Sequence, residues 1–187
     1  MAQFRASYGK KVHYQRLAME ARAKWLEMGH DLFVESGMLR VQPTSELGAL
    51  ELETLENMTK EGHRHQMFVR GDDADTRRAE AEGWGAKLLD FEDPQSETKE
   101  TFAAVLDTTA GFIKCSEACL YYYNLAKALG VDFVFGLEAG AFGRLVKDEA
   151  GQAVALKTKD GKEHPADVTV IAGERSYRLL QHLTSTH

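Results

Sequence analysis

The segment that decides the predicted fold is HPADVTVIAGERS, residues 164–176. Its first residues are polar, and an apolar run over residues 168–172 follows and stops at Gly173. A short apolar run bounded by turn residues and glycine is typical of a buried strand. Because glycine has no Cβ, a strand that ends this way also lets the backbone approach a bound dinucleotide closely. The segment therefore predicts a buried strand whose final glycine either makes a turn or lies against a bound ligand.

The residues before this segment predict a helix followed by a β-meander. Apolar side chains recur every three or four positions over residues 115–129, which indicates a helix that begins at Cys115 or Ser116 and ends at Gly130. Residues 131–135 then read as a strand, and the turn sequences at 149–152 and 160–161 have hairpin chemistry. We expect residues 114–173 to be the best-ordered part of the chain, with strands 131–135 and 168–172 in one sheet under the helix.

The first half of the chain reads as helices and one hairpin. Helical periodicity over residues 13–28, closed by Gly29, predicts an amphipathic helix. The two apolar runs in residues 32–41, separated by Ser36 and Gly37, predict a hairpin. Residues 44–62 read as a helix interrupted by Gly48, and residues 77–91 as a short helix.

Composition narrows the class of partner. The 187 residues suit about one domain with one core. A net charge of −6 and the lack of any basic block argue against binding along nucleic acid. No apolar run reaches the length of a membrane span, and no signal peptide is recognisable at the amino end, so we expect a cytoplasmic protein with no membrane partner. Small molecules or other proteins are the expected partners.

The histidines and cysteines do not predict a metal site. His63 with His65, and Cys115 with Cys119, are each short of the four ligands that a structural zinc site needs. A solvated turn for the histidines and helix packing for the cysteines are the simpler interpretations. The catalytic residues therefore remain unassigned, because no serine, histidine and acid grouping has positional support either.

Several segments, taken in order, resemble a known family. The sequence is similar to fungal fructosyl amino acid oxidases and sarcosine-oxidase-like proteins, within the D-amino-acid oxidase superfamily. The segments that carry the similarity are FRASYG (4–9), YQRLAMEARAKW (14–25), SGMLRV (36–41), LENMTKEG (55–62), RRAEAEGWGAKLLDF (77–91) and LDTTAGFIKCSEAC (106–119). The resemblance implies an α/β fold. It consists of an incomplete FAD-binding domain of the glutathione-reductase type, residues 1–30 and 107–187, interleaved with part of an α+β substrate domain, residues 31–106.

The resemblance also implies a cofactor and its contacts. In this family FAD lies along the sheet with its pyrophosphate at a G-x-G-x-x-G loop and a helix N-terminus. By resemblance, Ala172 and Gly173 lie against FAD, and the loop formed by Glu138, Ala139 and Gly140 lies near the adenine. Relatives place the glycine loop ahead of FRASYG and continue past the last strand, so we expect an internal, truncated portion of such an oxidase.

Three departures from the family pattern bear on the cofactor. The nearest glycine cluster, Gly136, Gly140 and Gly143, has the wrong spacing and follows a helix instead of preceding one. Glu174 stands close to where a pyrophosphate would lie, and like charges repel. The lysine that relatives hold near the flavin falls at Ala2 or before the start. These residues are therefore expected to bind FAD weakly or not at all.

Two functions remain open at this point. The first is an FAD-dependent oxidase that acts on a small amine, such as a fructosyl amino acid or another secondary amine, for which the cofactor performs the difficult step. The second is a non-catalytic remnant or interaction domain that keeps part of the architecture without flavin. Self-association through exposed sheet edges is a further expectation for a truncated chain.

Overall fold

The computed structural model describes residues 2–89 and 102–172. The chain divides into two compact units, Met1–Asn124 and Leu125–His187, and each is described by itself. Both helices and antiparallel strands are present, which confirms the mixed α/β class. Within the described residues, no helix has the length and apolarity that crossing a bilayer requires.

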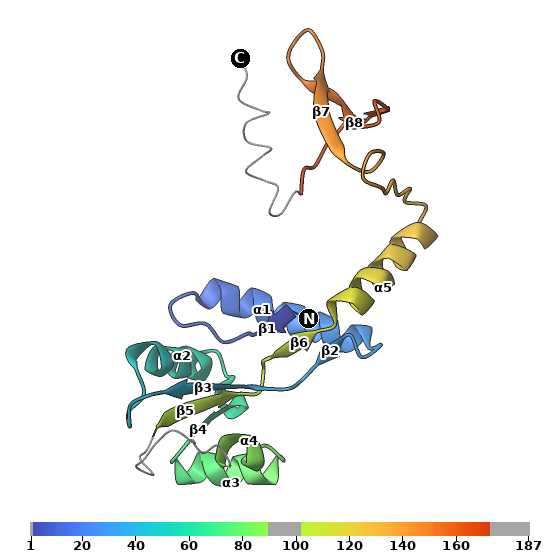
Figure 1. Ribbon diagram of the computed structural model, residues 1–187. Helices are drawn as coiled ribbons and strands as arrows, with labels where there is room; N and C mark the ends of the chain where they lie inside the picture. The colour runs from blue at the N-terminus through green and yellow to red at the C-terminus, as the bar shows by residue number, and fades with distance from the viewer. Residues whose placement is uncertain (1, 90–101, 173–187) are drawn as a thin grey trace. The chain divides into compact units, whose positions relative to one another are not determined.

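The core of the first unit is a three-stranded antiparallel sheet (Figure 1). Its central strand is β5 (Ala103–Asp107), which pairs with β3 (Met38–Gln42) on one side and β4 (Met67–Val69) on the other. All five residues of β5 are buried, as expected for a strand with a neighbour at each edge and a layer on each face.

Helices cover both faces of this sheet, and the alternation of side chains along each strand assigns the contacts. One face packs against α2 (Ala49–Lys60) through a cluster made of Met58, Met67 and Val105. The other face packs against α3 (Asp73–Ala81) and α4 (Gly85–Leu89), with the cluster Phe68, Ala79, Leu88 and Leu106. Figure 1 shows α2 on one side of the sheet and the α3 and α4 pair on the other.

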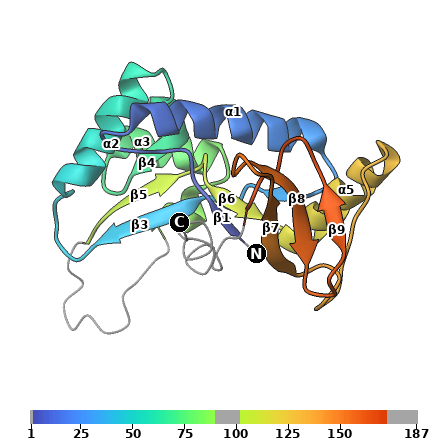
Figure 2. The same ribbon diagram turned by 90° about the horizontal axis from the view of Figure 1, so that it is seen from above.

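A second small sheet in this unit has the order β1 (Ala2–Phe4), β6 (Gly111–Ile113), β2 (Phe33–Val34). The Phe4 and Phe33 rings meet edge to face with centroids 5.2 Å apart. The long helix α1 (Val12–Met28) follows β1, and its Arg16 forms an ion pair with Glu61 at the end of α2. Figure 2 shows the two helices next to each other. The predicted helix 13–28 and its end at Gly29, where φ is 65°, are confirmed.

Replacing Gly111 by alanine is expected to destabilise the first unit by about 3 kcal/mol, because overpacking at a rigid site is costly. A Cβ at this position would lie 2.1 Å from the Val34 carbonyl oxygen and 2.9 Å from the Phe33 ring, so β2 and β6 could not pair as they do. Urea unfolding of the whole chain measures the effect. Gly48→Ala is the control, since its Cβ would meet only the ends of the Gln42 and Glu51 side chains. Equal stability of the two variants would contradict the prediction.

Two predictions in the first half are wrong. The runs 32–34 and 38–42 do not form a hairpin, because β2 pairs with β6 and β3 pairs with β5 in a different sheet. Gly37 has a positive φ of 68°, but it redirects the chain between sheets instead of closing a hairpin. Gly48 does not interrupt a helix. It is the N-cap of α2, with extended backbone, so the helix begins at Ala49.

The β-meander of the second unit is confirmed. Helix α5 (Cys115–Ala128) runs from the first unit into the second. It is followed by the antiparallel sheet β7 (Phe142–Lys147), β8 (Ala153–Thr158), β9 (Glu163–Pro165). The two turns contain Gly151 and Gly161, with φ of 80° and 90°, a backbone conformation that favours glycine.

The predicted strands at 131–135 and 168–172 are wrong. Both runs lack strand structure, and their apolar side chains are largely exposed, with Phe135 at 68% and Val170 at 84%. An apolar run becomes a buried strand only when a neighbouring strand pairs with its backbone and another layer covers its side chains. In the described part of the chain, the sheet of the second unit consists of β7, β8 and β9 and includes neither run. The expected sheet that contains strands 131–135 and 168–172 is therefore not formed in the described residues.

Candidate functional site

The first unit contains a pocket of about 840 Å³ beside Arg40, called the Arg40 pocket below. Its lining comes from the segment between β1 and α1, from β3, and from the start of α2. The polar and charged residues of the lining include Arg5, Ser7, Lys10, Lys11, Arg40 and Glu53. The volume is in the range of small-molecule sites.

A buried polar cluster lies at the end of β5, behind the Arg40 pocket. Asp107 is fully buried and accepts the Ser7 hydroxyl at Oδ2. Its Oδ1 accepts the Thr109 amide at 2.9 Å and the Thr109 hydroxyl at 2.5 Å. A buried carboxylate needs such donors to offset its lost hydration. Asp107 is thus satisfied without a direct hydrogen bond from an arginine.

Arg40 is the residue of the pocket with unused hydrogen-bonding capacity. It projects from β3, is half-buried, and donates from Nη1 to the Ser7 hydroxyl at 3.4 Å. Its Nε and Nη2 are buried, and neither has a hydrogen-bond partner among the described residues. Burial lowers the pKa of the Arg40 guanidinium, while the nearby carboxylates of Asp107 and Glu51 oppose that shift. Leaving buried donors without an acceptor is energetically costly.

The residues that line the pocket carry more positive than negative charge. Arg5, Lys10, Lys11 and Arg40 contribute four cations to the lining, and Glu53 is its one carboxylate. The outer cations also contact aromatic rings: the Arg5 guanidinium lies 5.1 Å from the Tyr8 centroid and the Lys11 ammonium 5.5 Å from that of Tyr14. The whole chain has a net charge of −6, so the pocket is a local positive region on a negative protein, and it attracts anions.

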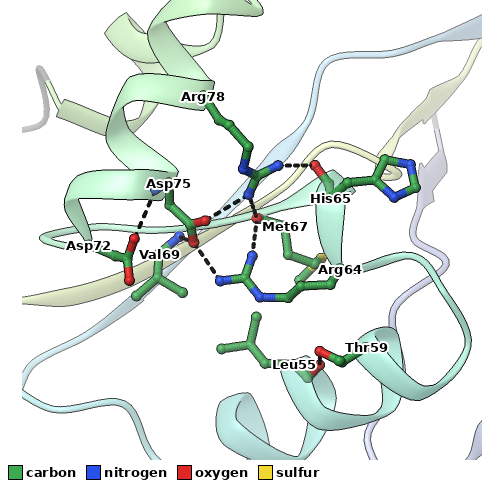
Figure 3. A network of polar contacts seen from close by, with 9 residues as sticks. All are labelled: Leu55, Thr59, Arg64, His65, Met67, Val69, Asp72, Asp75 and Arg78. Carbon is green, nitrogen blue, oxygen red and sulfur yellow. Dashed lines mark hydrogen bonds and ion pairs between the residues drawn. The ribbon is translucent and has the colours of Figure 1, made fainter.

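A second polar cluster, on the far side of the sheet from the Arg40 pocket, is structural. Asp75 of α3 is 4% exposed and accepts from Arg64 Nη2 at 2.6 Å, Arg78 Nη2 at 2.7 Å and the Val69 amide at 2.8 Å. Figure 3 shows both guanidinium groups pointing toward this carboxylate. Burial raises the pKa of Asp75, but the hydrogen bonds from Arg64, Arg78 and Val69 outweigh it and hold the pKa below its usual value.

The same arginines also satisfy the backbone of β4. Arg64 Nη1 donates to the Met67 carbonyl at 2.6 Å, and Arg78 Nη2 donates to the same oxygen at 2.9 Å. Asp72 caps α3 by accepting the Asp75 amide at 2.8 Å. Because the donors of this cluster bind protein acceptors, the cluster ties α3 to β4 and leaves little for a ligand (Figure 3).

The residues predicted to contact FAD lie in the second unit. Glu138, Ala139 and Gly140 form a turn, in which the Gly140 amide donates to the Gly136 carbonyl at 3.1 Å. A Cβ on Gly140 would lie 2.7 Å from the Phe135 carbonyl carbon, so the turn itself needs this glycine. Ala172 is exposed coil, and Gly173 and Glu174 lie outside the described residues.

The described residues do not fit the pyrophosphate of FAD. They contain no glycine-rich loop leading from a strand into a helix, and the amides of Gly140 and Ala141 already bind carbonyl oxygens within their own turn. A pyrophosphate site needs several free amides that converge on one point. The assignment of Glu138, Ala139, Gly140, Ala172 and Gly173 to FAD stays a prediction.

The sequence did not single out the residues of the Arg40 pocket. Ser7 and Asp107 are more than 90 positions apart, and only the pairing of the sheets brings them together. One signal was present: Arg40 interrupts the apolar strand MLRV, and a charge on a half-buried strand needs an explanation. Among residues 2–89 and 102–172, no three metal-ligating side chains gather in one place.

Comparison with known proteins places the fold. A modified fructosyl peptide oxidase from Aspergillus nidulans matches with a TM-score of 0.70 and 20% identity, covering 91% of this chain and 38% of its own. Amadoriase I from Aspergillus fumigatus, a fructosyl amine:oxygen oxidoreductase, matches with a TM-score of 0.53 and 20% identity, covering 88% of this chain and 36% of its own. The chain therefore spans less than two fifths of these relatives, and identities this low show the fold alone.

The family is shown by the sequence. A search of curated proteins finds no match. The family model described as FAD dependent oxidoreductase matches residues 1–184, which is nearly the whole chain. The protein therefore belongs to the FAD-dependent oxidoreductase family of the D-amino-acid oxidase type.

Proposed function

We propose that this protein serves the oxidation of a secondary amine, of the kind that fructosyl peptide oxidases and amadoriases act on, and that the Arg40 pocket holds the amine substrate. The observation that carries the proposal is a cavity of substrate size lined by Arg40 and further cations. Membership of the family and the fold shared with fructosyl peptide oxidases support the reaction class.

In the proposed domain assignment, the Arg40 pocket lies where the FAD-binding part meets the substrate part. Residues 1–30 and 107–187 belong to the FAD-binding part and residues 31–106 to the substrate part, in this proposal. The Arg40 pocket takes Arg5 to Tyr14 from the first part and Arg40 to Thr54 from the second. Binding sites commonly lie where two such parts meet.

The 187 residues by themselves are expected to bind FAD weakly. Two missing charge-assisted hydrogen bonds to the pyrophosphate cost about 1.5–3 kcal/mol each, which together exceeds a hundredfold in affinity. Titration of FAD fluorescence with purified protein measures the dissociation constant. Flavin that co-purifies in a one-to-one ratio would contradict this prediction.

The oxidase proposal is tested by turnover at excess FAD. We expect hydrogen peroxide to appear when the protein is incubated with FAD and fructosyl-valine or sarcosine. Peroxide formation above that of free FAD, removed by heating the protein, supports the proposal. No peroxide at an FAD concentration that saturates binding would overturn it. A non-catalytic interaction domain would then be the better description, in agreement with the exposed apolar runs 131–135 and 168–172.

A further inference from the structure

We propose that Cys115 and Cys119 form a two-thiolate site for a soft monovalent metal ion, Cu(I), at the start of α5. They are the two cysteines of the chain, both are free thiols, and both lie in the first unit. The inference goes beyond the proposed function and does not rest on it, because neither cysteine lines the Arg40 pocket.

The helix places the two thiols on one face. Helix α5 begins at Cys115 and continues past Cys119, so the side chains stand four positions apart, with Cβ atoms about 5–6 Å from each other. Side chains on a helix point toward its N-terminus, so the Cys119 thiol extends back over the turn that holds Cys115. One ion can therefore bond to both sulfur atoms.

Helix packing does not account for both thiols. Cys119 is exposed, so the packing role expected from the sequence is wrong for this residue, and an ion reaches it from solvent. Cys115 is half-buried, and its Sγ donates to the Ile113 carbonyl at 3.6 Å. A thiol is a weak donor, so this contact is a small loss when a metal ion replaces the proton.

The same geometry excludes a disulfide within the pair. A disulfide requires Cβ atoms about 3.5–4.5 Å apart, which is closer than the separation of about 5–6 Å at helix positions four apart. An ion bonded to both sulfur atoms puts two metal–sulfur bonds in place of one sulfur–sulfur bond. It therefore spans the wider gap without unwinding the first turn of α5.

The number of ligands selects the metal. A structural zinc site needs four ligands, and no third metal-ligating side chain joins the pair in the part of the chain that the structure describes. Cu(I) prefers soft thiolates and is stable with two of them in a linear arrangement. As each sulfur–copper bond forms, the thiol proton passes to solvent, and the copper stays Cu(I). Two thiolates and one monovalent cation leave the complex with a single negative charge.

The start of α5 suits a negatively charged complex. The first amides of a helix carry partial positive charge, and Lys114 adds a full positive charge next to them in the sequence. Glu117 is the acid of the first turn, but it is two positions from each cysteine and so lies on a different face of the helix. The local charges therefore favour an anion on the cysteine face.

Competition with the coloured Cu(I) chelator bicinchoninate, without oxygen and with ascorbate as reductant, tests the site. The full chain is expected to withdraw one Cu(I) per molecule from the chelator without a change in its elution volume on size exclusion. Because the assay contains neither FAD nor an amine, its result does not depend on whether the protein is an oxidase. No withdrawal of copper, or a copper-dependent dimer that joins Cys119 of two chains, would overturn the proposal.

Three variants isolate the pair, and circular dichroism establishes that each is folded. Cys115→Ser and Cys119→Ser each leave one thiol, and each is expected to weaken Cu(I) binding at least about a hundredfold, because the advantage of two linked ligands is lost. The matched control combines Ser116→Cys with Cys119→Ser at two exposed positions. It keeps two thiols, but adjacent side chains on a helix do not face each other, so it should bind like the single variants. Undiminished affinity in either single variant, or in the control, would contradict a site made by the spacing of this pair.

Discussion

Replacing Asp75 by asparagine is expected to lower the free energy of unfolding by about 3 kcal/mol at neutral pH. Breaking a buried ion pair from one side typically costs 3–5 kcal/mol. We expect the lower end of this range, because the side chains of Arg64 and Arg78 keep 33% and 34% of their surface in water while Asp75 keeps 6%. The variant would leave two guanidinium groups without their shared carboxylate.

The pH dependence gives this prediction a second readout. The pKa of folded Asp75 lies below its ordinary value, so its ionised form stabilises the fold above the unfolded pKa of about 3.9. That contribution is lost as the pH falls through the lower, folded pKa. The stability difference between the protein and Asp75→Asn is therefore expected to shrink below about pH 4.

Urea unfolding, followed by tryptophan fluorescence, measures the effect, since Trp84, one of the two tryptophans, packs against the cluster beneath α3. Asp73→Asn is the matched control: it removes an exposed carboxylate from the first turn of the same helix. Its expected cost is below about 1 kcal/mol. A difference that stays constant down to pH 2, or equal costs for the two variants, would show that Asp75 does not act through its charge.

Replacing Phe68 by alanine is expected to destabilise the first unit by about 3–5 kcal/mol, the usual cost of deleting a buried aromatic ring. Phe68 of β4 is fully buried on the face that packs against α3 and α4, in one cluster with Ala79, Leu88 and Leu106. The Arg78 guanidinium lies 4.5 Å from its ring centroid, so the cavity would also remove support from the Asp75 network.

Thermal and urea unfolding of the full chain measure this loss. Leu52→Ala is the control, because Leu52 also carries a large apolar side chain but is 55% exposed on α2. Its expected effect is within about 0.5 kcal/mol. Phe68→Leu, which keeps most of the volume, should fall between the two. A cost for Phe68→Ala no greater than that for Leu52→Ala would contradict the assignment of Phe68 to the core.

The helix end and the turns that the sequence predicted correctly depend on residues that are close together in the sequence. Helix α1 ends at Gly29 because only glycine adopts positive φ there at low cost, and the β7 to β9 meander turns at Gly151 and Gly161 for the same reason. The family resemblance, later shown by the match over residues 1–184, depends on the order of short segments, which is also a property of the sequence alone.

Tertiary structure decided which strands pair with each other, because that pairing depends on partners distant in the chain. The runs at 32–34 and 38–42 have hairpin chemistry, yet each finds a better neighbour in β6 or β5 about 60 or more positions away, and Gly48 became a helix cap. The apolar run at 168–172 found no strand to pair with in the described residues.

The Arg40 pocket shows the same division between sequence and tertiary structure. The sequence determined that a charged residue interrupts the strand 38–42, and its residue types determined which atoms could donate. Only the pairing of β3 with β5 and the approach of the β1 to α1 segment placed Ser7, Arg40 and Asp107 together. Whether a buried donor is satisfied depends on the positions of distant acceptors, and these positions follow from packing, which local propensity does not specify.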